Sequence, residues 1–280
     1  MFSNLSDLKK AGLFYVVVMT INVTQILIFR AVAPEAQIVA FTHMATPLLA
    51  TILMLFVFTR DGYKQRGRFG LGLRPSGWRT WGLALLLPLL ALTVSYGLGW
   101  LSRVAALIVP TDGGGLPNLL INLLISLITA PILVLGEEIG FRGYMLPRLL
   151  GLGPKRAIIL AGFLHGVWHL PIILLTPFYG DLGNPFLTLT IFLLLLTASG
   201  VLTGSLRLET DSIWPGTILH GAYNAFWDVF AALTVLSTPL AVYLVGETGV
   251  LTLLATVAVA FWFLNRRKTV VNPTPVLDHS

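Results

Sequence analysis

Residues 118–142 read NLLINLLISLITAPILVLGEEIGFR, an uncharged apolar run that ends in two adjacent glutamates. The run up to Gly136 has about 19 residues, which is long enough to cross a bilayer as one α-helix. Glu137 and Glu138 therefore stand at the end of a predicted span, where a carboxylate is costly and indicates a functional site. Arg142 follows Glu138 by one helical turn and can pair with it. Adjacent helix positions point about 100° apart, so Glu137 lies on another face, where it can act on a water molecule.

The composition is that of an integral membrane protein. Hydrophobic residues make up 56% of the chain and charged residues 11%, and the mean hydropathy is +0.85. Soluble domains carry about 25% charged residues. We expect an all-α transmembrane bundle forming one domain, residues 1–268, with a disordered tail at 269–280. About eight spans are predicted, at 12–29, 37–58, 81–101, 118–136, 157–175, 186–205, 214–235 and 248–264.

The positive charges predict a topology with both termini in the cytoplasm. On that assignment, all of the 18 basic residues except Arg30 and Arg103 fall on the cytoplasmic side. The net charge of +6 is then explained by orientation in a lipid membrane and contact with anionic headgroups, and no nucleic-acid partner is expected. The chain has no cysteine, which excludes thiolate metal sites and cysteine nucleophiles.

Two further motifs place polar residues one helical turn apart in predicted spans. His165 and His169 share a face of the span at 157–175, at a spacing that would also suit two metal ligands. The His-Glu-x-x-His pattern of zinc proteases does not occur anywhere in the chain. His220 and Asn224 share a face of the span at 214–235, and both can donate hydrogen bonds to an oxyanion. A base, a positioning group and oxyanion donors together favour peptide hydrolysis.

The three motifs resemble those of a known family. Glu-Glu-x-x-x-Arg at 137–142, His-x-x-x-His at 165–169 and His-x-x-x-Asn at 220–224 are similar to the CAAX protease and bacteriocin-processing family, which includes the type II CAAX prenyl endopeptidases. The likeness covers about residues 118–230. One position departs from the family pattern, because His165 stands where the family has Phe. We expect His165 to pack as a flat ring; the alternative is an added polar contact.

The resemblance implies a role for each motif residue. Glu137 would activate the attacking water with help from His169, and His220 and Asn224 would stabilise the oxyanion. Glu138 and Arg142 would hold Glu137 in place, and His165 would support the site. This mechanism needs no metal, so no cofactor is expected. The alternative is a Zn²⁺ ion held by Glu137, His169 and His220 that polarises the water.

The predicted activity is an intramembrane endopeptidase that acts on a peptide or protein at the cytoplasmic half of the bilayer. The short connections favour a prokaryotic protein of the inner membrane. Two alternatives stay open: a membrane protein that acts as an immunity factor or scaffold without proteolysis, and a proton- or ion-coupled transporter that uses the same Glu, His and Asn residues. The sequence leaves the substrate, and any need for prenylation, undefined.

Overall fold

The computed structural model describes residues 2–32, 36–61, 70–111, 113–176 and 183–266. The predicted tail at 269–280 and part of the basic connection after the second span lie outside these residues. Within them the long helices are α1 (Asp7–Val32), α2 (Ala36–Leu53), α3 (Trp81–Leu101), α4 (Gly115–Glu138), α6 (Pro154–Leu175), α7 (Pro185–Thr210), α8 (Trp214–Ala232) and α10 (Val250–Asn265). The short elements are helices α5 (Leu146–Leu149) and α9 (Ala241–Leu244) and strands β1 (Ala105–Leu107) and β2 (Thr234–Leu236), which pair antiparallel.

The acid pair closes α4 and is followed directly by a π-helical turn, Ile139–Met145. This turn joins α4 to α5 without a break in the helical path, and a 3-10 turn, Leu150–Leu152, then leads to α6. Helical segments of the π type occur mostly as single turns and are frequent at functional sites. All seven residues of this turn are buried, so the chain after the acid pair runs through the interior of the bundle.

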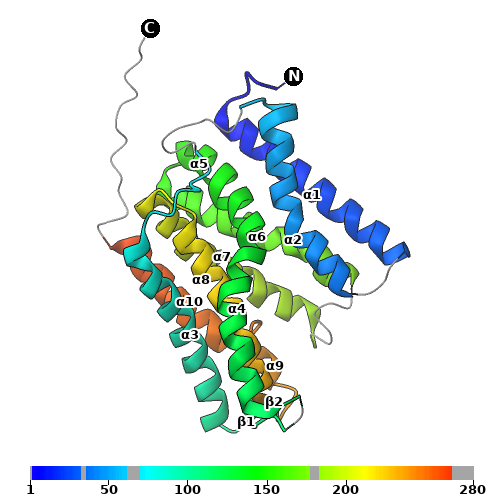
Figure 1. Ribbon diagram of the computed structural model, residues 1–280, viewed down its shortest axis with the longest axis vertical. Helices are drawn as coiled ribbons and strands as arrows, with labels where there is room; N and C mark the ends of the chain where they lie inside the picture. The colour runs from blue at the N-terminus through cyan, green and yellow to red at the C-terminus, as the bar shows by residue number, and fades with distance from the viewer. Residues whose placement is uncertain (1, 33–35, 62–69, 112, 177–182, 267–280) are drawn as a thin grey trace.

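The helices form two neighbouring groups that meet near the acid pair. In one part of the bundle α8 packs against both α4 and α3, and α10 packs against α3, while α1 and α2 lie together in another part (Figure 1). α6 packs against α7, and α7 packs against α8 and α10. The largest core cluster lies between these groups and includes Phe14, Phe141, Tyr144 and Trp168. The β1–β2 ribbon lies at the end of the molecule away from α5 (Figure 1).

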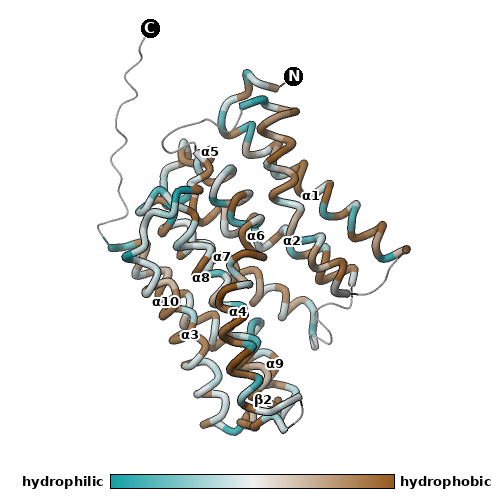
Figure 2. Tube along the Cα trace, in the orientation of Figure 1, coloured by the Kyte–Doolittle hydropathy of each residue, from teal (hydrophilic) through white to brown (hydrophobic). Residues whose placement is uncertain are grey.

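The all-α fold class is confirmed. Among the described residues, six helices are long and apolar enough to cross a membrane, including α4 with its continuation to Leu152. α10 is a shorter apolar helix, and α8 covers the remaining predicted span but carries His220, Asn224 and Asp228. Hydrophobic residues follow α4 through the middle of the molecule, and its residues Leu124 and Ile128 are exposed (Figure 2). The chain is an integral, multi-pass membrane protein; the side on which its termini lie stays a prediction.

Candidate active site

Glycines let the backbone of α2 approach the acid pair closely. Glu137 and Glu138 are only 2% and 0% exposed. A Cβ atom on Gly136 or Gly140 would lie 3.1 Å from a backbone carbonyl oxygen of α2. Such a contact is too tight for most side chains, so these two glycines allow α2 to pack directly against the end of α4. The glycines on either side of the acid pair therefore make its burial against α2 possible.

Arg142 connects the two glutamates through His165. Its Nη1 atom lies 3.2 Å from Oε1 of Glu138, which confirms the predicted pairing along the helix. The same nitrogen lies 2.9 Å from Nδ1 of His165. A guanidinium can only donate, so Nδ1 of His165 must accept and the ring proton must sit on Nε2. That Nε2 lies 2.9 Å from Oε2 of Glu137 and donates to it.

His165 is thus both a packed ring and a polar link. Its ring centroid lies 4.5 Å from that of Phe141 and 5.7 Å from that of Trp168, as expected for a flat packing group. The added polar contact, the alternative considered from the sequence, is also present and fixes the carboxylate of Glu137. The replacement of the family's Phe by His therefore changes what Glu137 touches.

His220 is held by Glu138. Its Nδ1 atom lies 3.0 Å from Oε1 of Glu138, which also accepts from Arg142. The carboxylate accepts, so Nδ1 of His220 donates and Nε2 is left as the second functional atom of the ring. Oε2 of Glu138 has no hydrogen-bond partner among the residues that the structure describes. Asn224 follows His220 by one turn of α8 and lines the same cavity.

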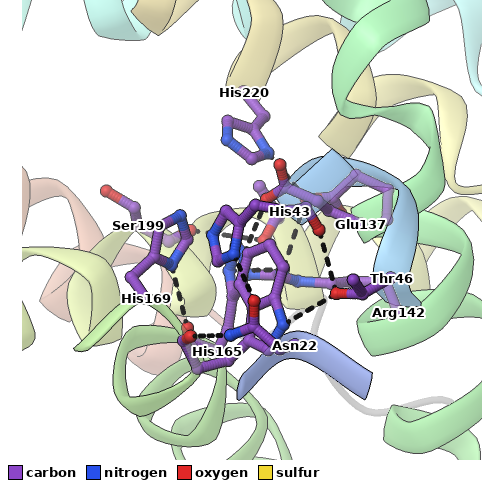
Figure 3. A network of polar contacts seen from close by, with 12 residues as sticks. Asn22, His43, Thr46, Glu137, Arg142, His165, His169, Ser199 and His220 are labelled. Atoms are coloured by element: carbon purple, nitrogen blue, oxygen red, sulfur yellow. Dashed lines mark hydrogen bonds and ion pairs between the residues drawn. The ribbon is translucent and has the colours of Figure 1, made fainter. Parts of the chain in front are cut away.

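His169, like His220, is held through its Nδ1 atom. Its Nδ1 atom lies 3.1 Å from the carbonyl oxygen of His165 and must donate to it. In the neutral ring, Nε2 of His169 then carries a lone pair. The ring centroid of His165 lies 5.0 Å from that of His169 and 5.8 Å from that of His220. Figure 3 shows these histidines gathered around Glu137.

The hydrogen bonds of His165 do not suit a metal ligand, whereas those of His169 and His220 leave Nε2 of each ring without a protein partner within the described ranges. Within the described part of the chain, Glu137, His165 and His169 each bring one ligand atom within 4.8 Å of the others. This group contains His165 in place of His220, so it differs from the set considered from the sequence. A ligating histidine needs a lone pair on one nitrogen and usually donates its other N–H to an acceptor. Arg142 offers a donor to Nδ1 of His165 instead, which keeps the proton on Nε2 beside Glu137.

The site lines a cavity of about 630 Å³. Its wall includes every motif residue named above, and also residues of α2, α3, α7 and the segment before α10. α2, α6 and α7 contribute apolar residues to the wall, among them Ala40, Ile172, Phe192 and Leu196, beside the polar residues of the same helices. The part near α9 is acidic, with Asp228 and Glu247. Burial raises the pKa of Glu247 to about 7, and the carboxylate of Asp228 adds to this while His220 opposes it.

Sequence analysis missed His43, a residue of α2 that also lines the cavity. His43 is 3% exposed and its ring stacks on that of Trp168, with centroids 3.7 Å apart. Its partner Asn22, on α1, is fully buried. Each is a polar side chain inside an otherwise apolar span, and this costly placement was the signal that could have found them.

A comparison with family models agrees with the geometry. Residues 116–226 match the model described as "Type II CAAX prenyl endopeptidase Rce1-like". The match contains all three motifs and ends two residues after Asn224. No curated protein matches the chain. Residues 116–226 therefore match an Rce1-like type II CAAX prenyl endopeptidase domain, and the family of that domain is a protease family.

Proposed function

We propose that the protein is an intramembrane endopeptidase in which Glu137 is the general base that activates water. The observation that carries the proposal is the buried cluster around Glu137, in which Arg142 and His165 orient the carboxylate from one side. The other carboxylate oxygen, Oε1, is then left for a water molecule. A base must lie within hydrogen-bond reach of the proton that it removes, and a fixed carboxylate on a cavity wall meets that condition.

The reaction follows from these positions. Glu137 takes a proton from water as the oxygen attacks the scissile carbonyl carbon, and the lone pair of His169 Nε2 accepts from the same water. The carbonyl oxygen becomes an oxyanion, which receives hydrogen bonds from Nε2–H of protonated His220 and from the amide of Asn224. Glu137 then gives its proton to the departing amide nitrogen, the C–N bond breaks, and a carboxylic acid and an amine leave; the acid loses its proton to solvent. Preorganised donors of this kind contribute about 10²- to 10³-fold each to rate.

Glu138 has a different role from Glu137. It accepts from both Arg142 and His220, so it holds the two motif residues that flank the reacting atoms. We therefore assign Glu138 and Arg142 as positioning residues. The substrate is a peptide or protein that enters from the membrane, and the positive-inside rule supports a site in the cytoplasmic half of the inner membrane. The apolar residues that α2, α6 and α7 contribute to the cavity wall suit an apolar or prenylated segment.

The test compares cells that carry wild-type, Glu137→Gln or Glu209→Gln protein. Glu209 pairs with Arg266 and receives the same substitution outside the cavity, so it is the matched control. Proteomic analysis of peptide termini should find new C-termini with wild-type and Glu209→Gln protein and none with Glu137→Gln. The same new termini in Glu137→Gln cells would refute the assigned base. If the protein produces no new termini and Glu137→Gln keeps its biological effect, a scaffold is favoured. Solute flux in proteoliposomes would favour a transporter.

A further inference from the structure

The buried amide of Asn22 fixes the proton position on His43. The side-chain nitrogen of Asn22 lies 2.8 Å from the carbonyl oxygen of Trp168. That carbonyl can only accept, so the amide nitrogen must face it and the amide oxygen must face the other way. The amide oxygen lies 2.7 Å from Nδ1 of His43. Nδ1 of His43 therefore carries a proton and donates, and in the neutral ring Nε2 carries a lone pair.

That lone pair is buried and unsatisfied. Nε2 of His43 has no hydrogen-bond partner among the described residues. The Nε1–H of the stacked Trp168 ring donates to Thr46, and the ring of His169, at a centroid distance of 5.3 Å, has a lone pair on Nε2 in its neutral form and cannot donate from there. A buried acceptor without a partner lowers stability, so native proteins rarely keep one without a purpose.

The place of His43 indicates what the missing donor is. His43 lies on the cavity wall, which the apolar residues Ile172 and Phe192 also line. Figure 3 shows it in front of the Glu137 cluster, next to His169. The two steps from His43 to His169 and from His169 to His165 measure 5.3 and 5.0 Å between ring centroids. An extended peptide rises about 3.3 Å per residue, so the 5.3 Å step to His169, which contacts the attacking water in the proposed reaction, places His43 within about two residues of the reacting bond.

We propose that Nε2 of His43 accepts a hydrogen bond from one backbone N–H of the bound peptide substrate. This contact sets the position of the chain along the cavity wall and so selects which bond reaches Glu137. The inference rests on the proposed function, because it names how that same site holds its substrate. His43 lies outside the matched residues 116–226, so the family match does not include it.

The test uses binding, so that it does not depend on cleavage. The probe is a fluorescent, farnesylated CAAX-type peptide, with a set of analogues in which one amide at a time is replaced by an ester. Each ester removes one N–H donor and places an oxygen lone pair at that position. Binding to Glu137→Gln protein is measured by fluorescence anisotropy, with His43 intact or changed to Phe. Phe keeps the ring on Trp168 and removes the acceptor.

With His43 intact, one ester position should weaken binding about tenfold, the factor that one ordinary hydrogen bond supplies. His43→Phe should weaken binding of the all-amide peptide by a similar factor, and the sensitive ester should then cost no more. His43→Gln, which keeps an acceptor, should restore part of the loss. The inference is overturned if no ester position weakens binding to protein that retains His43. It is also overturned if His43→Phe shows the same sensitive ester position, or if the peptide does not bind. Binding with the expected scan but no cleavage by wild-type protein contradicts the proposed function alone.

Discussion

The pairing of Glu138 with Arg142 gives the most quantitative prediction about stability. The side chains of Glu138 and Arg142 are 0% and 2% exposed, and Oε1 of Glu138 lies 3.2 Å from Nη1 of Arg142. Glu138→Gln keeps the shape of the side chain but removes its charge, leaving the Arg142 cation buried without a carboxylate at this distance. Breaking a buried pair by neutralising one partner costs about 3–5 kcal/mol. We expect a loss of about 3 kcal/mol, at the lower end because the Gln oxygen still accepts a hydrogen bond.

The chain contains a matched control for this change. Arg207 and Asp211 have the same spacing along a helix, but the Asp211 side chain is 63% exposed. Asp211→Asn should therefore cost less than about 1 kcal/mol, as exposed ion pairs do. Asn is also well suited to the positive φ of 52° at this position. The two substitutions differ mainly in burial of the acidic group.

Thermal unfolding of the purified protein in detergent measures both changes. A loss of about 3 kcal/mol lowers the melting temperature by roughly 6–12 °C in a protein of this size, against about 4 °C or less for the control. Equal shifts for Glu138→Gln and Asp211→Asn would refute the argument, since burial of the charge would then have no effect. A large shift for both would mean that the helix pair as such, and not its burial, sets the cost.

Three further predictions concern groups outside the acid pair. Burial acts to raise the pKa of Asp61, but hydrogen bonds from Lys10, Thr59 and Arg148 outweigh it and hold the pKa below its ordinary 3.8. Asp61→Asn should therefore lower the melting temperature at neutral pH. The difference in melting temperature from wild type should shrink as the pH falls below about 4. The raised pKa of Glu247, about 7 against an ordinary 4.5, means that its contribution to stability is lost as the pH rises between those values. Glu247→Gln should accordingly be more stable than wild type at about pH 8 and similar to it below about pH 4.5, and the reverse order would contradict this. A Cβ on Gly162 would lie 2.8 Å from the carbonyl oxygen of Thr197, whereas one on Gly151 meets nothing within 4 Å. In the same unfolding assay, Gly162→Ala should lower the free energy of unfolding by about 1–3 kcal/mol, and Gly151→Ala should leave it almost unchanged.

The sequence predicted most of the fold because membrane spans follow from length and apolar composition alone. Segments such as 118–136 are uncharged over enough residues to require a helix, since lipid cannot satisfy backbone hydrogen bonds. The pairing of Glu138 with Arg142 was also predictable, because it depends only on helical spacing. The π-helical turn at Ile139–Met145 was not, because it arises where the chain is packed on all sides by elements distant in sequence.

The contacts between helices could not be derived from spacing. From the sequence, the ring of His165 could pack against other side chains, donate a hydrogen bond or accept one. Only the position of Arg142 next to its Nδ1 atom shows that this nitrogen accepts. The binding of Glu138 to His220 joins α4 to α8, 82 positions apart in the chain. His43 and Asn22 are likewise polar residues in different spans, and the bond between them could be found only from the packing of α1, α2 and α6.

The central claim is that Glu137 activates water without a metal ion. Its most direct test is the cleavage rate of the farnesylated fluorogenic peptide, measured with wild-type and Glu137→Gln protein before and after dialysis against a zinc chelator, with the metal content of each sample determined. The account predicts that chelation leaves the wild-type rate unchanged and that Glu137→Gln lowers it by about 10²- to 10⁴-fold. A wild-type rate that is lost on chelation and restored by Zn²⁺ would contradict it.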